Sequence, residues 1–109
     1  MAYDEGLARR IRDILGDRPT LVEKKMFGGI AFMLHGNFAC GVNQENLVVR
    51  VGQEKFEAAL AQPHCREMDF TGRPMKGWVY VSADGYREEA GLADWVQQGV
   101  DFALSLPPK

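Results

Sequence analysis

Hydrophobic residues recur at two different spacings along the chain, and the change of spacing separates helices from strands. Four apolar residues spaced i, i+4, i+7 and i+8 from Leu7 predict a helix over residues 4–15. Six apolar residues from Leu92 to Ala103 repeat with the same helical period and predict a longer helix over residues 89–105. Proline follows both stripes closely, as expected where a helix ends.

Short apolar runs separated by turn residues fill much of the chain between these helices. In residues 21–51 the runs are VEKKMF, GGIAFML, FACGV and LVVRV. A Gly36–Asn37 pair and the segment NQEN, residues 43–46, predict the turns between them. Further along, residues 66–70 alternate, with Met68 and Phe70 facing one way, and WVYV at 78–81 is rich in strand formers.

These elements predict an α+β fold of two layers. Residues 53–60 add a short helix, so the order is helix, strand meander, short helix, two strands, long helix. Strands joined by tight turns favour an antiparallel sheet, and a sheet this small needs helices to cover one face. The 109 residues suit one domain spanning 1–109.

Composition indicates a globular protein without a membrane segment. Hydrophobic residues make up 46% and charged residues 26% of the chain, near the average for this class. We find no apolar stretch of about 18 residues and no signal peptide. We therefore expect no membrane contact and a cytoplasmic location with reduced thiols.

The charge distribution leaves one region that suits an anionic partner. The net charge is −2 and the pI about 5.6, whereas domains that bind nucleic acid often have a pI above roughly 9. Residues 18–76 nevertheless carry eight cations and six acids, and residues 77–109 are acidic. A binding surface for anions is therefore expected in the middle of the chain.

The segment TGRPMKG, residues 71–77, contains the most suggestive group of cations. It joins two predicted strands and lacks the Walker spacing, so turn chemistry at Gly72 and Pro74 favours a connecting loop. Arg73 and Lys76 could still meet a phosphate or carboxylate, with arginine binding in a bidentate manner.

The segment KKMFGG offers a second pair of cations. In a strand, Lys24 and Lys25 would point to opposite faces, so only one of them could join a patch. Gly28 and Gly29 permit a bulge or sharp bend. The alternative to a binding role is an edge strand whose lysines deter pairing with other chains.

Thiols and imidazoles are too few and too scattered for a zinc site. The chain has two cysteines, Cys40 and Cys65, and two histidines, His35 and His64, without the paired spacing of zinc ligands. Cys40 lies in an apolar run, where cysteine is usually a small core residue. A Cys–His nucleophile pair stays open, although no local signature supports it.

Several segments together resemble the N-terminal domain of the TfoX/Sxy family of bacterial competence regulators. These are KKMFGGIAFML with GNFACGV, then LVVRVG, MDFTGRPMKGWVYV and LADWVQQGVDFALSLPPK; the similarity spans residues 10–109. The resemblance implies helix, three strands, helix, two strands, helix, which gives an antiparallel sheet of about five strands. It also implies a stand-alone N-terminal domain without the helical C-terminal domain of longer members.

The family resemblance implies transcriptional regulation, because its members act with the cyclic-AMP receptor protein to switch on DNA-uptake genes. It supplies no catalytic residue, metal or cofactor, and we expect none. The first hypothesis is a non-enzymatic regulatory domain that touches a transcription factor or DNA through Lys24, Lys25, Arg73 and Lys76; a second copy of the chain is a further candidate partner.

Two alternatives belong to other functional classes. One is a small-ligand or anion-binding domain whose site is lined by Gly72, Arg73, Lys76 and Gly77. The other is an enzyme that uses the thiolate of Cys40 or Cys65, which would need an exposed, electropositive setting.

Overall fold

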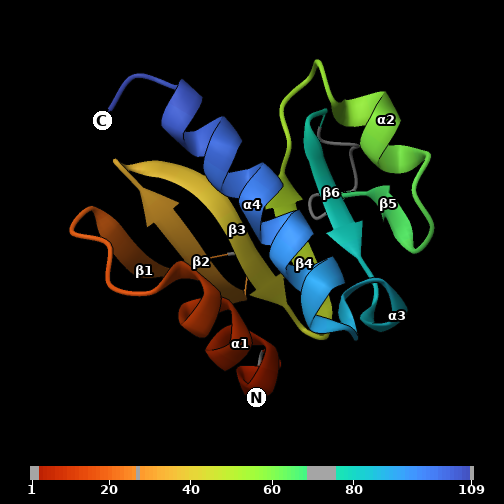
Figure 1. Ribbon diagram of the computed structural model, residues 1–109, viewed down its shortest axis with the longest axis horizontal. Coiled ribbons are helices and arrows are strands. Elements are labelled where there is room, and N and C mark those ends of the chain that lie inside the picture. Colours follow the sequence, from red (N-terminus) through yellow and green to blue (C-terminus); the bar gives the residue numbers. More distant parts are fainter. Residues whose placement is uncertain (1–2, 27, 69–75, 109) are drawn as a thin grey trace.

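Antiparallel strands form one open sheet in the order β1-β2-β3-β4-β6-β5 (Figure 1). The computed structural model describes residues 3–26, 28–68 and 76–108. The strands are β1 (Leu21–Met26), β2 (Gly29–Leu34), β3 (Asn37–Asn43), β4 (Asn46–Arg50), β5 (Cys65–Glu67) and β6 (Trp78–Val81). The helices are α1 (Glu5–Leu15), α2 (Phe56–Leu60), α3 (Ala83–Tyr86) and α4 (Glu89–Ser105).

The predicted α+β class and the antiparallel sheet are confirmed. Within the described residues the sheet has six strands rather than about five. Four strands precede α2, as the four segments of residues 21–51 predict, rather than the three that the resemblance implies. The strands are not all neighbours in chain order, because β6 pairs with β4 and thereby places β5 at the edge of the sheet. This crossover brings the start of β6 beside the end of β4, where Trp78 pairs with Arg50.

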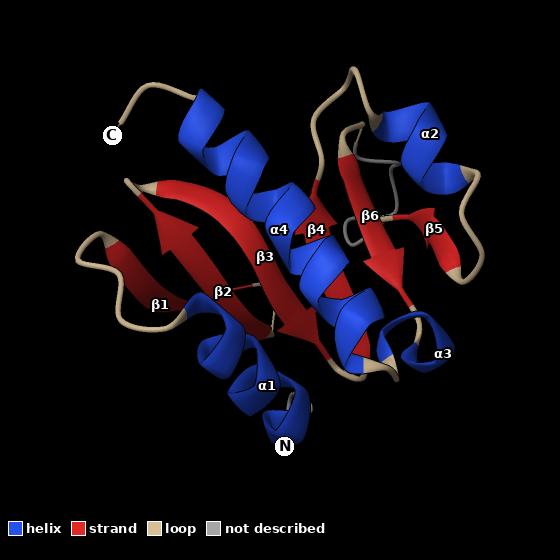
Figure 2. Ribbon diagram, in the orientation of Figure 1, coloured by secondary structure: helices blue, strands red, loops and turns tan. Residues whose placement is uncertain are grey.

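Helices α1 and α4 cover one face of the sheet, as the apolar stripes predict (Figure 2). Helix α4 has the predicted bounds and crosses β3 and β4 with Trp95 in the core. Helix α1 begins after Asp4, whose carboxylate accepts a hydrogen bond of 3.1 Å from the Leu7 amide. Such a cap satisfies one of the amide groups that the first turn of a helix leaves unpaired.

Both faces of the sheet bury apolar side chains. Toward the helices the strands contribute mainly valine, leucine and isoleucine, in one cluster with α1 and α4. A second cluster, on the opposite face, holds Ala31, Phe38, Val48 and Tyr80 from the strands together with Met68, which follows β5. Trp78 packs partly buried against this second cluster, so Trp78 and Tyr80, two positions apart on β6, share a core face.

One hairpin turn lies a residue earlier than the sequence predicts. The turn between β2 and β3 is formed by His35 and Gly36, both at positive φ, and Asn37 is instead the first residue of β3. Asn37 pairs with Leu34 and is buried, with its side-chain amide donating a 3.0 Å hydrogen bond to the Pro107 carbonyl. The Asn37 side chain therefore holds the segment after α4 against the start of β3, a role that does not depend on a position in the turn.

The short elements differ most from the prediction. Helix α2 starts at Phe56, three residues after the predicted start, and β5 covers Cys65–Glu67 rather than 66–70. Phe70 lies outside the described residues, whereas Met68 is buried as expected. Helix α3 was not predicted, because four residues are too few to show a helical period.

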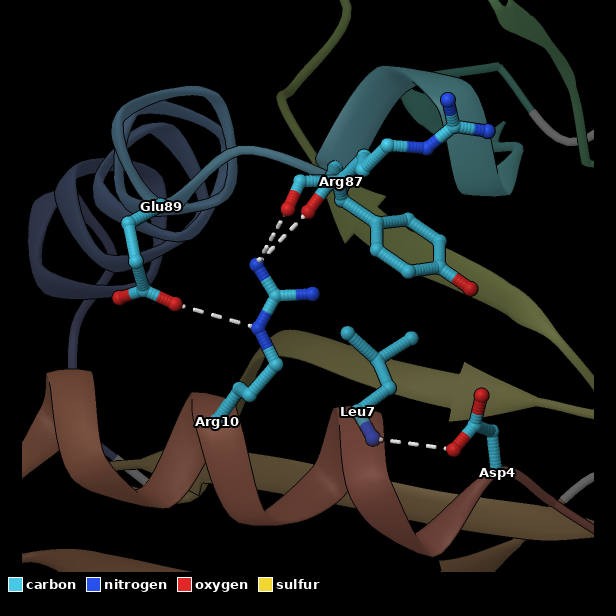
Figure 3. A network of polar contacts seen from close by, with 6 residues as sticks. Asp4, Leu7, Arg10, Arg87 and Glu89 are labelled. Atoms are coloured by element: carbon cyan, nitrogen blue, oxygen red, sulfur yellow. Dashed lines mark hydrogen bonds and ion pairs between the residues drawn. The ribbon is translucent and has the colours of Figure 1, made fainter.

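Arg10 joins the first helix to the last two (Figure 3). Its guanidinium donates hydrogen bonds to the carbonyl oxygens of Tyr86 (2.9 Å) and Arg87 (3.1 Å) and to the Glu89 carboxylate (3.1 Å). Because Tyr86 ends α3 and Glu89 begins α4, one side chain of α1 fixes the corner between those helices.

Candidate anion-binding pocket

The predicted basic residues do not gather into one patch. Lys24 and Lys25 lie on β1 at one edge of the sheet and point to opposite faces, as expected, since they pair with Ala31 and Ile30. Lys76 precedes β6, and three strands separate β6 from β1 in the sheet order. Arg73, the fourth predicted cation, lies outside the described residues.

The predicted loop glycines divide between two places. Gly28 precedes β2 and Gly29 is its first residue, paired with Met26 across a tight hairpin without a bulge. The register shift of the sheet falls further along β2, between Phe32 and Met33. Gly77 directly precedes β6 and Gly72 lies outside the described residues, so Gly77 is the described loop glycine next to a predicted cation.

Lys76 and Gly77 line a pocket of about 580 Å³ at one end of the sheet. It lies where the end of β4, the connection to α2, the start of β6 and the last turns of α4 meet. Its walls are Arg50, Val51, Gly52, Gln53, Glu54, Lys55, Lys76, Gly77, Trp78, Asp101, Phe102 and Ser105. This volume falls in the range of roughly 300–1,000 Å³ that is usual for small-molecule sites.

Arg50 is the best-fixed cation of the pocket. Its guanidinium carbon lies 5.1 Å from the ring centroid of Trp78 and 5.1 Å from that of Phe102. Such cation–π contacts hold the planar group against the rings while its N–H edges stay available for hydrogen bonds. The Trp78 ring is itself supported by Phe38, at 4.5 Å between centroids.

Two glycines form the floor of the pocket. The Gly77 carbonyl accepts hydrogen bonds from the amides of Val51 (2.8 Å) and Gly52 (3.1 Å), which ties the two connections together. Both glycines have positive φ, 86° at Gly52 and 89° at Gly77, a conformation that other residues adopt only with strain. Gly77, which the sequence predicts to line a binding loop, therefore shapes the backbone at the pocket.

The pocket contains more positive than negative side chains, and they are not paired with each other. Arg50, Lys55 and Lys76 line it together with Glu54 and Asp101. Among the described residues, the ion pairs are Arg10–Glu89, Arg12–Glu23 and Arg87–Asp84, and none of them involves the pocket. The arrangement leaves three cations available to an anion, with two carboxylates near them.

The sequence prediction named Lys76 and Gly77 but missed Arg50, Lys55 and Phe102. These residues belong to β4, to the connection to α2 and to α4, which meet the start of β6 through the pairing of β6 with β4 and the packing of α4 on β4. A local signal does exist at Arg50, which ends the apolar run LVVRV and directly precedes Val51 and Gly52. A cation at the end of a buried strand, followed by glycine, is a reasonable marker of a site at a sheet end.

The thiols lie in surroundings that suppress thiolate formation. Cys40 is buried in the core, and burial raises the pKa of its thiol to about 12. Cys65 is half-buried, and burial raises its pKa to about 11. Neither environment resembles the exposed, electropositive setting of a reactive cysteine.

Metal-ligand clusters and membrane-spanning helices are both absent from the part of the chain that the structure describes. No group of three histidine, cysteine or acidic side chains there could hold a metal ion. No helix among these residues combines the length and apolar character needed to cross a bilayer.

A comparison with protein-family models matches residues 13–103 to the TfoX N-terminal domain, which covers most of the chain. Comparisons with curated proteins and with solved structures gave no match. The matched region contains every wall residue of the pocket except Ser105.

Proposed function

The chain belongs to the TfoX N-terminal domain family, and we propose on this basis that it is a non-enzymatic regulatory domain that works by binding an anionic group in the Arg50 pocket. Family membership supports the regulatory part of the proposal, and the pocket supports the binding part. The acidic group would belong to a protein or DNA partner in transcriptional regulation, or to a small ligand that controls such a partner.

One observation carries the proposal: three cations from separate segments line the same cavity, and none of them forms an ion pair with another described residue. Arg50 comes from β4, Lys55 from the connection to α2, and Lys76 from the residue before Gly77. Arginine is planar and fixed, whereas the lysines are flexible, so together they suit carboxylate or phosphate oxygens. Charged groups brought together without partners cost stability by repulsion, and an anion would relieve that cost.

The pocket favours a compact acidic group over extended contact with duplex DNA. DNA-binding surfaces usually follow the phosphate backbone with many cations, and their affinity falls steeply with salt. Here Lys24 and Lys25 lie at the far edge of the sheet from Lys76. An acidic side chain, a terminal carboxylate or a small organic anion fits the observed grouping better.

Two double variants of equal charge change test this proposal. Lys55→Gln/Lys76→Gln removes two pocket cations, and Lys24→Gln/Lys25→Gln removes two cations from the edge strand. Thermal melting would be followed with citrate, L-glutamate, inorganic phosphate and adenosine monophosphate, because a ligand that prefers the native state raises the melting temperature. Fluorescence anisotropy of a labelled DNA duplex at low and moderate salt would be measured alongside.

The proposal expects at least one anion to stabilise the unmodified chain and the edge variant but not the pocket variant. Each kcal/mol of stabilisation should raise the melting temperature by about 4–8 °C. If no anion acts on the unmodified chain and duplex DNA also fails to bind, the proposed site is wrong. If only Lys24→Gln/Lys25→Gln loses binding, the anion binds at β1 and not in the pocket.

A further inference from the structure

We infer that the pocket binds an amino acid that carries a second acidic group, such as an amino dicarboxylate. This inference rests on the proposed function and names the ligand class for the same site. It follows from the presence of both charge signs in the pocket. Three cations and two carboxylates give a net charge of +1, which a ligand with two acids and one ammonium would neutralise.

Two side chains of opposite charge in the pocket each contact a neighbouring side chain. Arg50 is held between the rings of Trp78 and Phe102, both at 5.1 Å. Asp101, which precedes Phe102 on α4, accepts a 2.8 Å hydrogen bond from the Gln97 side chain to Oδ1. Among the described residues nothing donates a hydrogen bond to its second carboxylate oxygen, which can accept one from a ligand.

These two charges line one cavity without pairing. Arg50 and Asp101 lie beyond the 4.0 Å that defines an ion pair. An α-amino acid carries a carboxylate and an ammonium on one carbon, and so offers a partner of opposite charge to each of these groups. Its carboxylate would bind the N–H edge of Arg50, and its ammonium would donate to Asp101, with Glu54 as a second carboxylate nearby.

The remaining cations account for the second acidic group. Lys55 and Lys76 come from the two connections that the Gly77 carbonyl ties together, and both side chains are exposed at the pocket. A side-chain carboxylate on the ligand would bind to these flexible ammonium groups. A simple monoacid would leave them unpaired.

The aromatic residues of the pocket are already engaged, which favours this ligand over a nucleotide. Trp78 contacts Arg50 at 5.1 Å and Phe38 at 4.5 Å, and Phe102 contacts Arg50. Recognition of a nucleobase usually relies on stacking against an open aromatic ring. In this pocket the rings orient Arg50 instead.

A matched series of ligands tests the inference. L-Glutamate carries both acids and the ammonium, glutarate lacks the ammonium, and L-glutamine lacks the second acid. Isothermal titration calorimetry on the full chain should show glutamate binding roughly tenfold more tightly than either analogue, which corresponds to about 1.4 kcal/mol. Equal affinity for glutarate and glutamate would overturn the ligand class while leaving an anion pocket. If none of the three ligands binds and no anion raises the melting temperature, both the anion pocket and the amino dicarboxylate ligand are contradicted.

Two variants on α4 test whether Asp101 is the group that binds the ligand ammonium. Asp101→Asn should bring glutamate to the affinity of glutarate or below it, because the ammonium loses its carboxylate partner. Asp94→Asn is the control: Asp94 accepts a 3.3 Å hydrogen bond from Gln98 with the same spacing on the helix but does not line the pocket. A preference for glutamate that survives Asp101→Asn would overturn the inference.

Discussion

Gly52 and Phe102 lie so close together that a β-carbon at position 52 would come within 2.4 Å of Cε1 of Phe102. The contact joins the connection after β4 to α4 and holds the Phe102 ring against the Arg50 guanidinium. The geometry of the pocket therefore depends on a residue that carries no functional group.

Substitution of Gly52 should destabilise the fold in two ways. Gly52→Ala places a side chain at positive φ, which costs about 1–2 kcal/mol, and displaces the Phe102 ring, which adds about 1–3 kcal/mol as overpacking does. Gly28→Ala is the control, since Gly28 has a φ of 73° but open space around its missing side chain. Urea unfolding should show the larger loss for Gly52→Ala; equal losses would contradict the close contact.

The planar guanidinium of Arg50 should contribute more to anion binding than a lysine of the same charge would. Arg50→Lys keeps the charge but loses the planar group between Trp78 and Phe102, so anion affinity should fall several-fold and stability by about 0.5–1 kcal/mol. Arg66→Lys is the matched variant, because Arg66 lies 4.7 Å from the Tyr80 ring and does not line the pocket. It should show a similar change in stability and unchanged anion affinity in the same titration.

The Arg10 contacts predict an unequal effect of two variants at the same corner. Arg10→Ala removes hydrogen bonds to two carbonyl oxygens and one carboxylate, and should lower the unfolding free energy by about 2 kcal/mol. Glu89→Gln disturbs only the exposed ion pair and should cost less than about 0.5 kcal/mol. Denaturant unfolding of both variants measures the difference, and equal losses would show that the carbonyl contacts contribute little.

Alkylation of the native thiols should be slow near neutral pH. Burial raises the pKa of Cys65 to about 11 and that of Cys40 to about 12, so little thiolate exists at pH 7.5. Iodoacetamide should react far faster in urea than with the folded chain, and the native rate should rise steeply above pH 9. Fast native alkylation at pH 7.5 would instead support the cysteine enzyme.

The same shifts give the direction of a stability change in alkali. Both thiols have an ordinary pKa of 9.0, and the folded chain holds their protons more tightly than the unfolded chain does. The contribution of the protonated thiols to the unfolding free energy is fully present below about pH 9, the pKa in the unfolded chain. It is lost as the pH rises toward the pKa values in the folded chain. The urea concentration at the midpoint of unfolding should therefore decrease less between pH 9 and pH 11 in Cys65→Ser than in the unmodified chain.

The sequence predicts long elements well and the pocket poorly, for a physical reason. Helix α4 agrees with its predicted bounds because its stripe repeats over 17 residues, whereas α3 has four residues and leaves no period. The register of β4 against β6 is a long-range property that no local pattern contains. Lys76 and Gly77 approach Arg50 through that pairing, and Phe102 approaches Arg50 through the packing of α4 on β4. The sequence of residues 71–77 could therefore point only to Lys76 and Gly77.

Helix α1 also determines where the folding unit begins. The family match starts at residue 13, inside this helix, while Leu7, Ala8 and Ile11 are buried in the core before that point. A chain shortened to residue 13 would lose these side chains, the Asp4 cap and the Arg10 contacts together. The boundary of the family match therefore cuts through the hydrophobic core, and a fragment that begins at residue 13 should be less stable than the full chain.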